Sequence, residues 1–295
     1  MDVALIVNPF ASAVTEERVR VVEEKLSRAG SVRTVLTERA GHAVELAAAA
    51  REEAVVVYSG DGGFNEVLNG VPEGVLLGFL SGGGTNVLPR ALGLPRDAAA
   101  AARQVADALQ VDRTRTISLG RVNGRRFAFA AGVGLDAELI RSVDALGRRA
   151  DGKRPGDFAF VAAAMRLLLD RHARFEPALE LRGHGRAAFA LVANADPYSY
   201  VGTVPLHVAP EARFELGLDV VAPEHVTAST LPRLLRYVFA GGGQQKADGI
   251  VYAHDLDRLE IACDRPLALQ ADGEDLGDVD QAVFEAERGA ARVLI

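Results

Sequence analysis

The sequence has little of several residue types, and each shortage excludes a class of protein. It contains a single cysteine, Cys263, so no intrachain disulfide can form. That excludes a disulfide-stapled scaffold and fits a reducing compartment. No apolar run approaches the roughly 18 residues needed to span a bilayer. No signal peptide is evident, because the apolar stretch Ala4 to Val7 ends at once in Asn8-Pro9. We therefore expect a cytoplasmic protein.

Several catalytic motifs are also missing. There is no Walker sequence GxxxxGK[ST], no HExxH and no GxSxG, so P-loop chemistry is excluded and hydrolase functions have no motif behind them. The net charge of −7 argues against a general nucleic-acid binder. What remains is a globular composition, with 49% hydrophobic and 25% charged residues in 295. That length suffices for two domains.

A glycine-rich turn lies at the centre of the first half. Ala54 to Tyr58 is a continuous apolar run, which predicts a strand buried on both faces. Ser59-Gly60-Asp61-Gly62-Gly63 follows and is too rich in glycine for a regular element, and Phe64 to Leu68 predicts the start of a helix. Strand, glycine turn and helix form a geometry that binds phosphate, because the free N–H groups at the helix start favour negative charge.

A second turn of the same kind comes next. Val75 to Leu80 predicts another strand, Ser81 to Asn86 reads SGGGTN, and Val87 to Leu92 predicts a short helix. Either turn alone is as readily an ordinary tight turn. The two together favour a nucleotide site.

The two turns resemble a known pair of motifs. SGDGGFNEVLNG followed by SGGGTNVLPRALGLP is similar to the paired glycine-rich motifs of the diacylglycerol kinase catalytic-domain family, which includes soluble bacterial lipid kinases and the sphingosine and ceramide kinases. The resemblance runs over nearly the whole chain. It implies an ATP-dependent lipid kinase that transfers the γ-phosphoryl group to the hydroxyl of a diacylglycerol-like lipid, with Mg²⁺ and with a general base in the cleft between two domains.

The order of predicted elements gives the fold class. Strands and helices alternate to about Leu109, which predicts an α/β, doubly wound parallel sheet. From Thr114 strands follow strands, with a hairpin at Asn123-Gly124, which predicts an antiparallel β-sandwich. We place the nucleotide domain at residues 1–115 and the lipid domain at 116–289. The resemblance implies that a last strand, 290–295, returns to the first domain.

The resemblance also implies which residues bind the nucleotide. Thr37 has a competing interpretation as a helix cap, and Glu66 could simply complement a helix dipole. The residues implied are Asn8, Thr37, Ser59, Gly60, Asp61, Gly62, Gly63, Asn65, Glu66, Gly83, Gly84, Thr85 and Asn86.

Two residues are candidates for a metal site. A carboxylate inside a phosphate turn needs a metal or a donor beside it, so Asp61 is a candidate Mg²⁺ contact. The alternative is a turn residue that satisfies its own backbone. Glu215 is the remnant of a segment that resembles a structural Mg²⁺ loop.

The candidate catalytic residues come late in the chain. Gln270-Ala271-Asp272-Gly273-Glu274 resembles the family's terminal Asp-Gly-Glu motif, whose aspartate is assigned as general base. Asp272 is therefore expected to accept the proton of the lipid hydroxyl, supported by Glu274. From the residues alone, an ordinary Asp-Gly hairpin turn is favoured.

Three departures from the family pattern leave a second hypothesis open. The family usually has threonine where this chain has Gly63 and an aspartate tied to the metal network where it has Ser118. It also has a hydroxyl residue where this chain has Gly84, and Thr85, one position later, is a candidate substitute. A catalytically impaired member that binds nucleotide or lipid is therefore an alternative. A weaker one is an NAD(P)-dependent oxidoreductase, because Gly132-x-Gly134-x-x-Ala137 fits GxGxxA.

A cluster of basic residues suggests transient contact with a membrane surface. Because aspartates are interspersed, a solvated, ion-paired face fits equally well, and the sequence leaves a homodimer open. The basic residues are Arg141, Arg148, Arg149, Lys153, Arg154, Arg166, Arg171 and Arg174.

Overall fold

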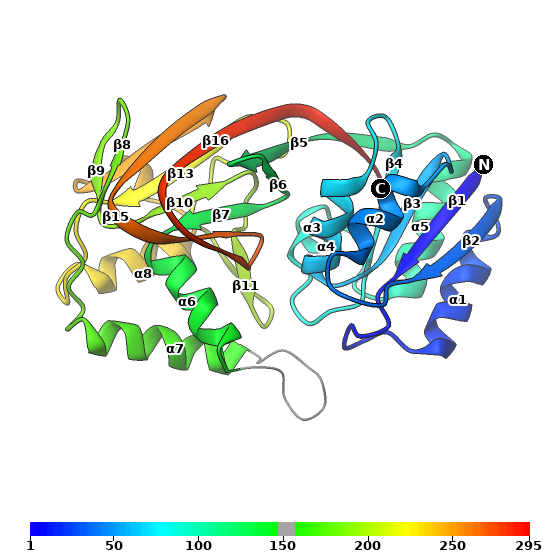
Figure 1. Cartoon of the computed structure of the whole chain (residues 1–295), viewed down its shortest axis with the longest axis horizontal. Coiled ribbons are helices and arrows are strands. Elements are labelled where there is room, and N and C mark those ends of the chain that lie inside the picture. Colours follow the sequence, from blue (N-terminus) through cyan, green and yellow to red (C-terminus); the bar gives the residue numbers. More distant parts are fainter. Residues whose placement is uncertain (147–156) are drawn as a thin grey trace. The chain divides into compact units, whose positions relative to one another are not determined.

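The computed structural model describes residues 1–146 and 157–295 and divides into two compact units. Unit 1 consists of Met1–Ser118 and Arg288–Ile295, and unit 2 of Leu119–Glu287. Two strands begin in one unit and end in the other, β5 (Thr114–Val122) and β16 (Glu274–Leu294) (Figure 1).

Unit 1 alternates strands and helices along the chain. The strands form one parallel sheet in the order β16-β4-β3-β1-β2, to which β16 contributes its last residues. The α/β parallel sheet predicted from the sequence is therefore confirmed. Its elements are β1 (Asp2–Val7), α1 (Glu16–Leu26), β2 (Ser31–Leu36), α2 (His42–Ala49), β3 (Ala54–Ser59), α3 (Asp61–Gly70), β4 (Leu76–Ser81), α4 (Val87–Ala91) and α5 (Ala98–Gln110).

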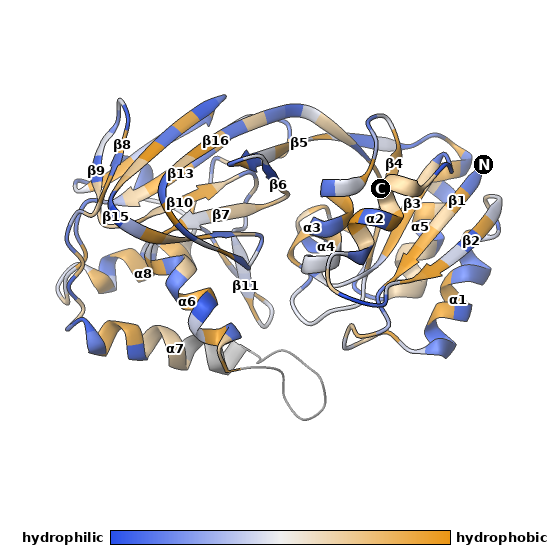
Figure 2. Cartoon of the chain, in the orientation of Figure 1, coloured by the Kyte–Doolittle hydropathy of each residue, from blue (hydrophilic) through white to orange (hydrophobic). Residues whose placement is uncertain are grey.

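The central strands of unit 1 are apolar because helices cover both faces of the sheet. Every residue of β3 and β4 is buried, and both strands are mostly hydrophobic in Figure 2. On one face, Leu26 of α1 and Val105 of α5 share a core with Val56. On the other, Phe64 of α3 meets Phe79 of β4 edge to face at 5.4 Å. This double cover produces the continuous apolar runs seen in the sequence.

The start of α3 differs from the prediction. The expectation of an irregular Ser59–Gly63 turn was wrong, because α3 begins at Asp61 and includes Gly62 and Gly63. The Phe64 N–H already bonds to the Gly60 carbonyl at 3.2 Å. Glycine is a poor helix former, but the apolar residues that follow it bury themselves against the sheet. Tertiary packing therefore overrides local preference.

Unit 2 is built around antiparallel strands. Its sheet runs β14-β13-β10-β7-β15-β16, and β8 and β9 extend it beside β15. The antiparallel β domain predicted from the sequence is confirmed. Its elements are β6 (Arg125–Phe127), β7 (Ala130–Val133), α6 (Leu135–Asp144), α7 (Asp157–Asp170), β8 (Leu179–Leu181), β9 (Gly185–Ala187), β10 (Ala190–Ala193), β11 (Ser199–Val201), β12 (Val204–Leu206), β13 (Leu218–Pro223), α8 (Leu231–Ala240), η1 (Gln244–Lys246), β14 (Ile250–Leu256) and β15 (Arg258–Ala271).

The predicted Asn-Gly hairpin is present. Val122 of β5 pairs with Arg125 of β6, and Asn123 and Gly124 between them have φ values of 47° and 89°. Both residues must have positive φ in the tight turn that suits strand twist, and these two residue types tolerate it best. This hairpin prediction is therefore confirmed.

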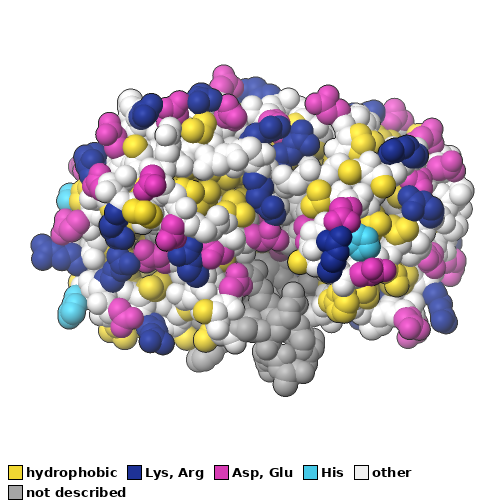
Figure 3. All heavy atoms as spheres, viewed as in Figure 1, with side chains coloured by type: hydrophobic (Ala, Val, Ile, Leu, Met, Phe, Trp, Pro, Cys, Tyr) yellow, Lys and Arg dark blue, Asp and Glu magenta, His cyan; other side chains and the backbone are white. Residues whose placement is uncertain are grey.

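The surface carries charges of both signs. On the face shown in Figure 3, Lys and Arg side chains interleave with Asp and Glu. Within residues 1–146 and 157–295, no helix is long and apolar enough to cross a membrane.

The contact between α2 and α3 generates a testable prediction. A Cβ on Gly70 would overlap the carbonyl oxygen of Val44, and backbone cannot move aside as a side chain can. Alanine in a helix normally gains about 0.5–1 kcal/mol over glycine. We expect Gly70→Ala instead to lower the free energy of unfolding by about 1–3 kcal/mol, the usual effect of overpacking. Urea denaturation measures it.

The matched control is Gly242→Ala, where a Cβ meets nothing within 4 Å. We expect this change to stay within about 0.5 kcal/mol of the wild type. Equal effects of the two substitutions would contradict the close approach of α2 and α3.

Candidate functional site

The two glycine turns of unit 1 touch each other. Ser59 and Ser81, the last residues of β3 and β4, are register partners. The Gly82 N–H donates to the Ser59 carbonyl at 2.7 Å. A Cβ on Gly83 would lie 2.8 Å from the Cα of Gly60. Glycine is therefore required at the contact, and the turns form one surface at the carboxyl ends of the strands, where α/β sheets bind their ligands.

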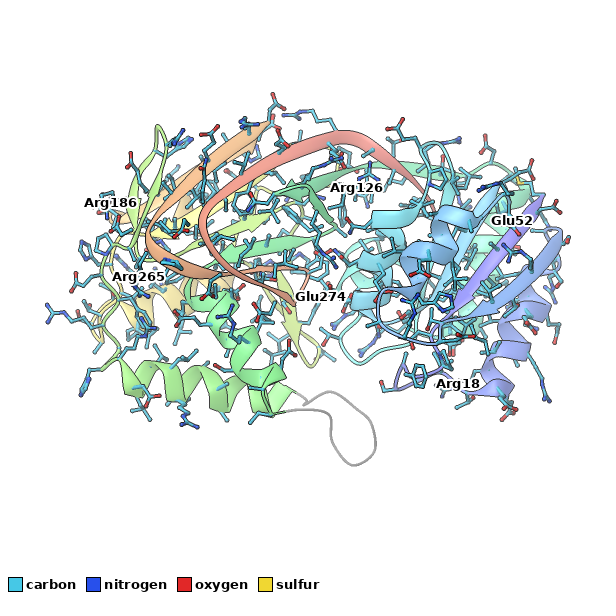
Figure 4. All side chains as sticks on the ribbon, in the orientation of Figure 1. Arg18, Glu52, Arg126, Arg186, Arg265 and Glu274 are labelled. Atoms are coloured by element: carbon cyan, nitrogen blue, oxygen red, sulfur yellow. The ribbon has the colours of Figure 1, made fainter. Side chains whose placement is uncertain are left out.

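A cavity of about 700 Å³ lies beside the second turn. Its size is that of a typical small-molecule pocket. Ser81, Gly83, Gly84 and Asn86 line one part of it, and the acidic residues Glu17 and Asp97 also contribute. Three arginines line the cavity and bring side chains of a type that binds anions. They are Arg18, which Figure 4 labels on α1, Arg90 and Arg96.

Other predicted nucleotide residues lie at the ends of neighbouring strands. Asn8 follows β1 and accepts the Phe10 N–H at 3.0 Å. Thr37 follows β2 and is buried, and its backbone N–H donates to the Val7 carbonyl at 2.8 Å. Since carboxyl ends of parallel strands meet at one edge of the sheet, both residues stand on the same edge as the turns.

Three further residues hold the turns in shape. Asn86 accepts the Gly83 N–H at 2.9 Å and donates to the Gly83 carbonyl at 2.7 Å. Its φ of 50° is one that asparagine tolerates. Asn65 is fully buried, and its carbonyl and side-chain oxygens both accept the Asn69 amide. The Thr85 carbonyl accepts from Arg90 at 3.4 Å.

Glu66 has a clear structural partner. Its two carboxylate oxygens accept the N–H groups of Gly41 at 2.9 Å and of Ala43 at 3.1 Å, at the start of α2. Gly41, the N-cap residue of α2, has no side chain to do this itself. Glu66 thereby satisfies backbone donors that a helix start leaves open and complements its dipole.

The metal prediction finds little support in the arrangement. Asp61 accepts the Leu88 N–H at 3.3 Å, in the first turn of α4. Glu215 is exposed and belongs to unit 2. Among the described residues, no three His, Cys, Asp or Glu side chains are grouped so that they could hold a metal ion. The Mg²⁺ contacts stay a prediction.

In unit 2, Asp272 and Gly273 form the hairpin turn between β15 and β16. Ala271 pairs with Glu274, and the two turn residues have φ values of 49° and 79°. The Asp272 side chain is 4% exposed. Its carboxylate accepts three backbone N–H groups in a row, from Ala128 at 2.7 Å, Phe129 at 3.0 Å and Ala130 at 3.2 Å. The turn therefore also locks a charged group in one orientation.

Glu274 lies at the start of β16 (Figure 4) and forms an ion pair with Arg125 at 2.5 Å. Asp275 is held in the same way by Arg141, whose guanidinium also bonds to Asp278. The hairpin that carries Asp272 is thus fixed by charge pairs as well as by backbone bonds.

A buried polar network beside this turn was missed from the sequence. Asp136 accepts the hydroxyl of Tyr198 at 2.6 Å and the amide of Gln270 at 2.6 Å. Gln270 in turn accepts the Gly273 N–H at 2.9 Å, so the network reaches the Asp272 turn. Burial raises the pKa of the Asp136 carboxyl, while the two hydrogen bonds oppose that shift. No spacing in the sequence joins residues 136, 198 and 270.

The GxGxxA sequence packs against this network. A Cβ on Gly132 would lie 2.7 Å from a carboxylate oxygen of Asp136. The preceding strand, β7, is antiparallel to both of its neighbours, β10 and β15. A dinucleotide fingerprint sits in a parallel βαβ unit, so the structure offers no support for the oxidoreductase alternative.

Comparisons with known proteins agree with the geometry. A sequence model of the diacylglycerol kinase catalytic domain matches residues 2–122, and one of the YegS C-terminal NAD kinase beta sandwich-like domain matches residues 130–295. The chain belongs to the diacylglycerol kinase catalytic-domain family. The family resemblance noted in the sequence is confirmed.

Individual relatives in this family cover part of the chain. A diacylglycerol kinase of Bacillus subtilis (strain 168) is 34% identical over 147 residues, 47% of this chain and 48% of that protein. The chain spans between 32% and 49% of the length of the first curated relatives that it matches.

Solved structures of the family share the fold over almost the full chain. A diacylglycerol kinase from Bacillus anthracis strain Sterne superimposes with a TM-score of 0.72 at 18% identity, covering 99% of this chain and 96% of that one. An NAD kinase from Archaeoglobus fulgidus in complex with ATP gives a TM-score of 0.53 at 11% identity, covering 99% and 93%.

In the described part of the basic cluster that suggested membrane contact, the arginines form ion pairs. Arg141 pairs with Asp275 and Asp278, Arg171 with Glu138, and Arg174 with Glu176. Exposed pairs of this kind leave little net charge to attract an anionic surface. Arg166 pairs with Asp170, and Arg148, Arg149, Lys153 and Arg154 lie outside the described residues. Membrane contact by this family member stays a prediction, as does a homodimer.

The raised pKa of Asp136 generates a stability prediction. A folded-state pKa above the unfolded value of about 3.9 means that stability falls as pH rises through this range and stays lower above it. Both hydrogen bonds use one oxygen, Oδ2, so the amide of Asp136→Asn can accept both. We expect this variant to melt at a higher temperature than the wild type at pH 7 to 8.

The gain should shrink as the pH is lowered toward 4, because protonation of the wild-type carboxyl removes the buried charge. Each unit of pKa shift corresponds to about 1.4 kcal/mol. Asp248→Asn, an exposed aspartate, is the matched control and should show no such pH dependence. A gain that is the same at pH 4 and pH 8 would exclude the buried charge as its cause.

Proposed function

We propose that this protein is an ATP-dependent lipid kinase that transfers the γ-phosphoryl group of ATP to the hydroxyl of a diacylglycerol-like lipid. The observation that carries the proposal is the pair of glycine turns in contact at the carboxyl ends of β3 and β4, beside a cavity lined by arginines. Membership of the family and the ATP named for the NAD kinase neighbour add support.

The nucleotide fits the residues of unit 1. Glycine at both turns lets phosphate oxygens approach the backbone, and the first N–H groups of α3 favour negative charge. Arg18, Arg90 and Arg96 supply further positive charge. Mg²⁺ often binds proteins through one or two carboxylates together with substrate phosphates, and Asp61 is the residue that would hold it here. When bound, the ion neutralises charge that develops on the phosphates.

In this proposal Asp272 positions and deprotonates the lipid hydroxyl. The alcohol oxygen forms a bond to the γ-phosphorus, the bond from that phosphorus to the bridging oxygen of ADP breaks, and the alcohol proton passes to the carboxylate. Three N–H donors orient that carboxylate. A fixed orientation suits phosphoryl transfer, because that reaction depends chiefly on positioning and charge stabilisation. Glu274 supports the turn through Arg125.

A nucleotide- or lipid-binding member with impaired catalysis is the second candidate. Ser118 stands where the family commonly has an aspartate, is fully buried and accepts the Gly289 N–H at 3.4 Å. Such a side chain supplies no negative charge to a metal network. This candidate predicts ATP binding with no phosphoryl transfer to any lipid.

The decisive experiment follows labelled γ-phosphate from ATP to a panel of micellar lipid alcohols, with and without Mg²⁺. We expect product with the wild type. Asp272→Asn should reduce transfer at least about 100-fold, the usual contribution of a positioned acid–base group, while ATP binding persists. Asp248→Asn, which changes an exposed aspartate of the same unit, is the matched control and should retain activity.

The outcomes separate the candidates. Transfer that survives in Asp272→Asn would remove Asp272 from its role as base. Normal ATP binding without transfer by the wild type to any lipid on the panel would favour the impaired member. Thermal denaturation of each variant shows whether a loss of activity is a loss of fold, since Asp272 also bonds to three backbone groups.

A further inference from the structure

The hydroxyl of Ser81 is buried and has no partner. Ser81 is the last residue of β4, is 6% exposed and lines the cavity beside the second glycine turn. Its Oγ makes no hydrogen bond to any residue in the described ranges 1–146 and 157–295. The hydroxyl of its register partner Ser59, which is 1% exposed, also has no hydrogen-bond partner among the described residues.

Such a pair of hydroxyls is unusual in a folded protein. More than nine in ten buried polar groups find a partner, because leaving one unsatisfied lowers stability. Two other hydroxyls of unit 1 do have hydrogen-bond partners. Tyr58 donates to the Ala13 carbonyl at 3.1 Å, and Ser118 accepts the Gly289 N–H. The ends of β3 and β4 are therefore exceptional at the place where the cavity opens.

Two backbone N–H groups of the second turn are already bonded within the protein. The Gly83 N–H is occupied by the Asn86 side chain, and the Gly82 N–H by the Ser59 carbonyl. An anion that enters this part of the cavity therefore meets two N–H groups that are already bonded. The Ser81 hydroxyl is a donor beside them that has no partner among the described residues.

We infer that the Ser81 hydroxyl binds a phosphate oxygen of the nucleotide. This inference rests on the proposed function and names a residue that is not among the nucleotide-binding residues implied by the resemblance. The hydroxyl rotates to donate to an oxyanion, and the arginines that line the cavity hold the same charged group. Ser81 thereby supplies a hydroxyl to a turn that has Gly84 where the family usually has a hydroxyl residue.

Ser59 occupies the corresponding position before the first turn, at the end of β3. A Cβ on Gly63 would overlap the Ser59 hydroxyl, so the serine fills the space that a longer side chain at 63 would need. Both strands thus end in a serine hydroxyl, and in the second turn Thr85 adds another hydroxyl further along.

The test compares Ser81→Ala with the wild type by calorimetric titration with ATP and by thermal denaturation without ligand. We expect ATP to bind about 10- to 100-fold more weakly, as for the loss of a hydrogen bond to a charged group. The melting temperature without ligand should stay the same or rise, because the substitution removes an unsatisfied buried hydroxyl. Adenosine, which has no phosphate, should compete equally well with both proteins.

Ser118→Ala is the matched control, since it removes a buried serine hydroxyl that has a partner in the same unit. It should lower the melting temperature and leave ATP affinity unchanged. An ATP affinity of Ser81→Ala within about two-fold of the wild type would overturn the inference and leave the kinase proposal standing. So would a lower melting temperature without ligand, or equal loss of adenosine binding. Failure of the wild type to bind ATP would instead overturn the proposed function, and the inference with it.

Discussion

Unit 1 depends on the close parallel pairing of β3 and β4, which carries two backbone turns into contact. Register places Ser59 opposite Ser81. Gly60, directly after Ser59, and Gly83, two residues after Ser81, then meet with no room for a side chain between them. Only glycine relieves that contact, and glycine also leaves backbone open to a ligand. The same constraint thus explains why glycine occupies both sides of the contact between the turns.

Unit 2 fixes its own candidate site by a different means. The Asp272-Gly273 turn needs positive φ at both residues, which these residue types tolerate. Three backbone N–H groups then hold the carboxylate, and Gln270 connects the turn to the buried pair Asp136 and Tyr198. A charged group held by so many donors keeps one orientation. It therefore suits a role in which position matters more than basicity.

Several departures from the family motifs acquire a physical meaning in the structure. Gly63 is compatible with Ser59 because their side-chain spaces overlap. Gly84 and Ser81 both line the cavity, and Ser81 carries an unsatisfied hydroxyl. Ser118, by contrast, is bonded to backbone and contributes no charge. The first two departures therefore lie in turns that have a buried serine hydroxyl without a partner, whereas the third places a neutral side chain where the family commonly has a charged one.

The sequence by itself determined the features that arise from local patterning. Continuous apolar runs such as Ala54 to Tyr58 predicted a covered parallel sheet. Asn123-Gly124 predicted the hairpin between β5 and β6, and the two glycine-rich motifs predicted the family. Tertiary structure alone decided which groups meet. Packing drew Gly62 and Gly63 into α3 against their helix propensity. Glu66 accepts a hydrogen bond from the start of α2, and Asp136 accepts one from Gln270, which lies 134 residues away in the sequence. Burial and hydrogen bonding between distant segments depend on the folded backbone, and no local spacing encodes them.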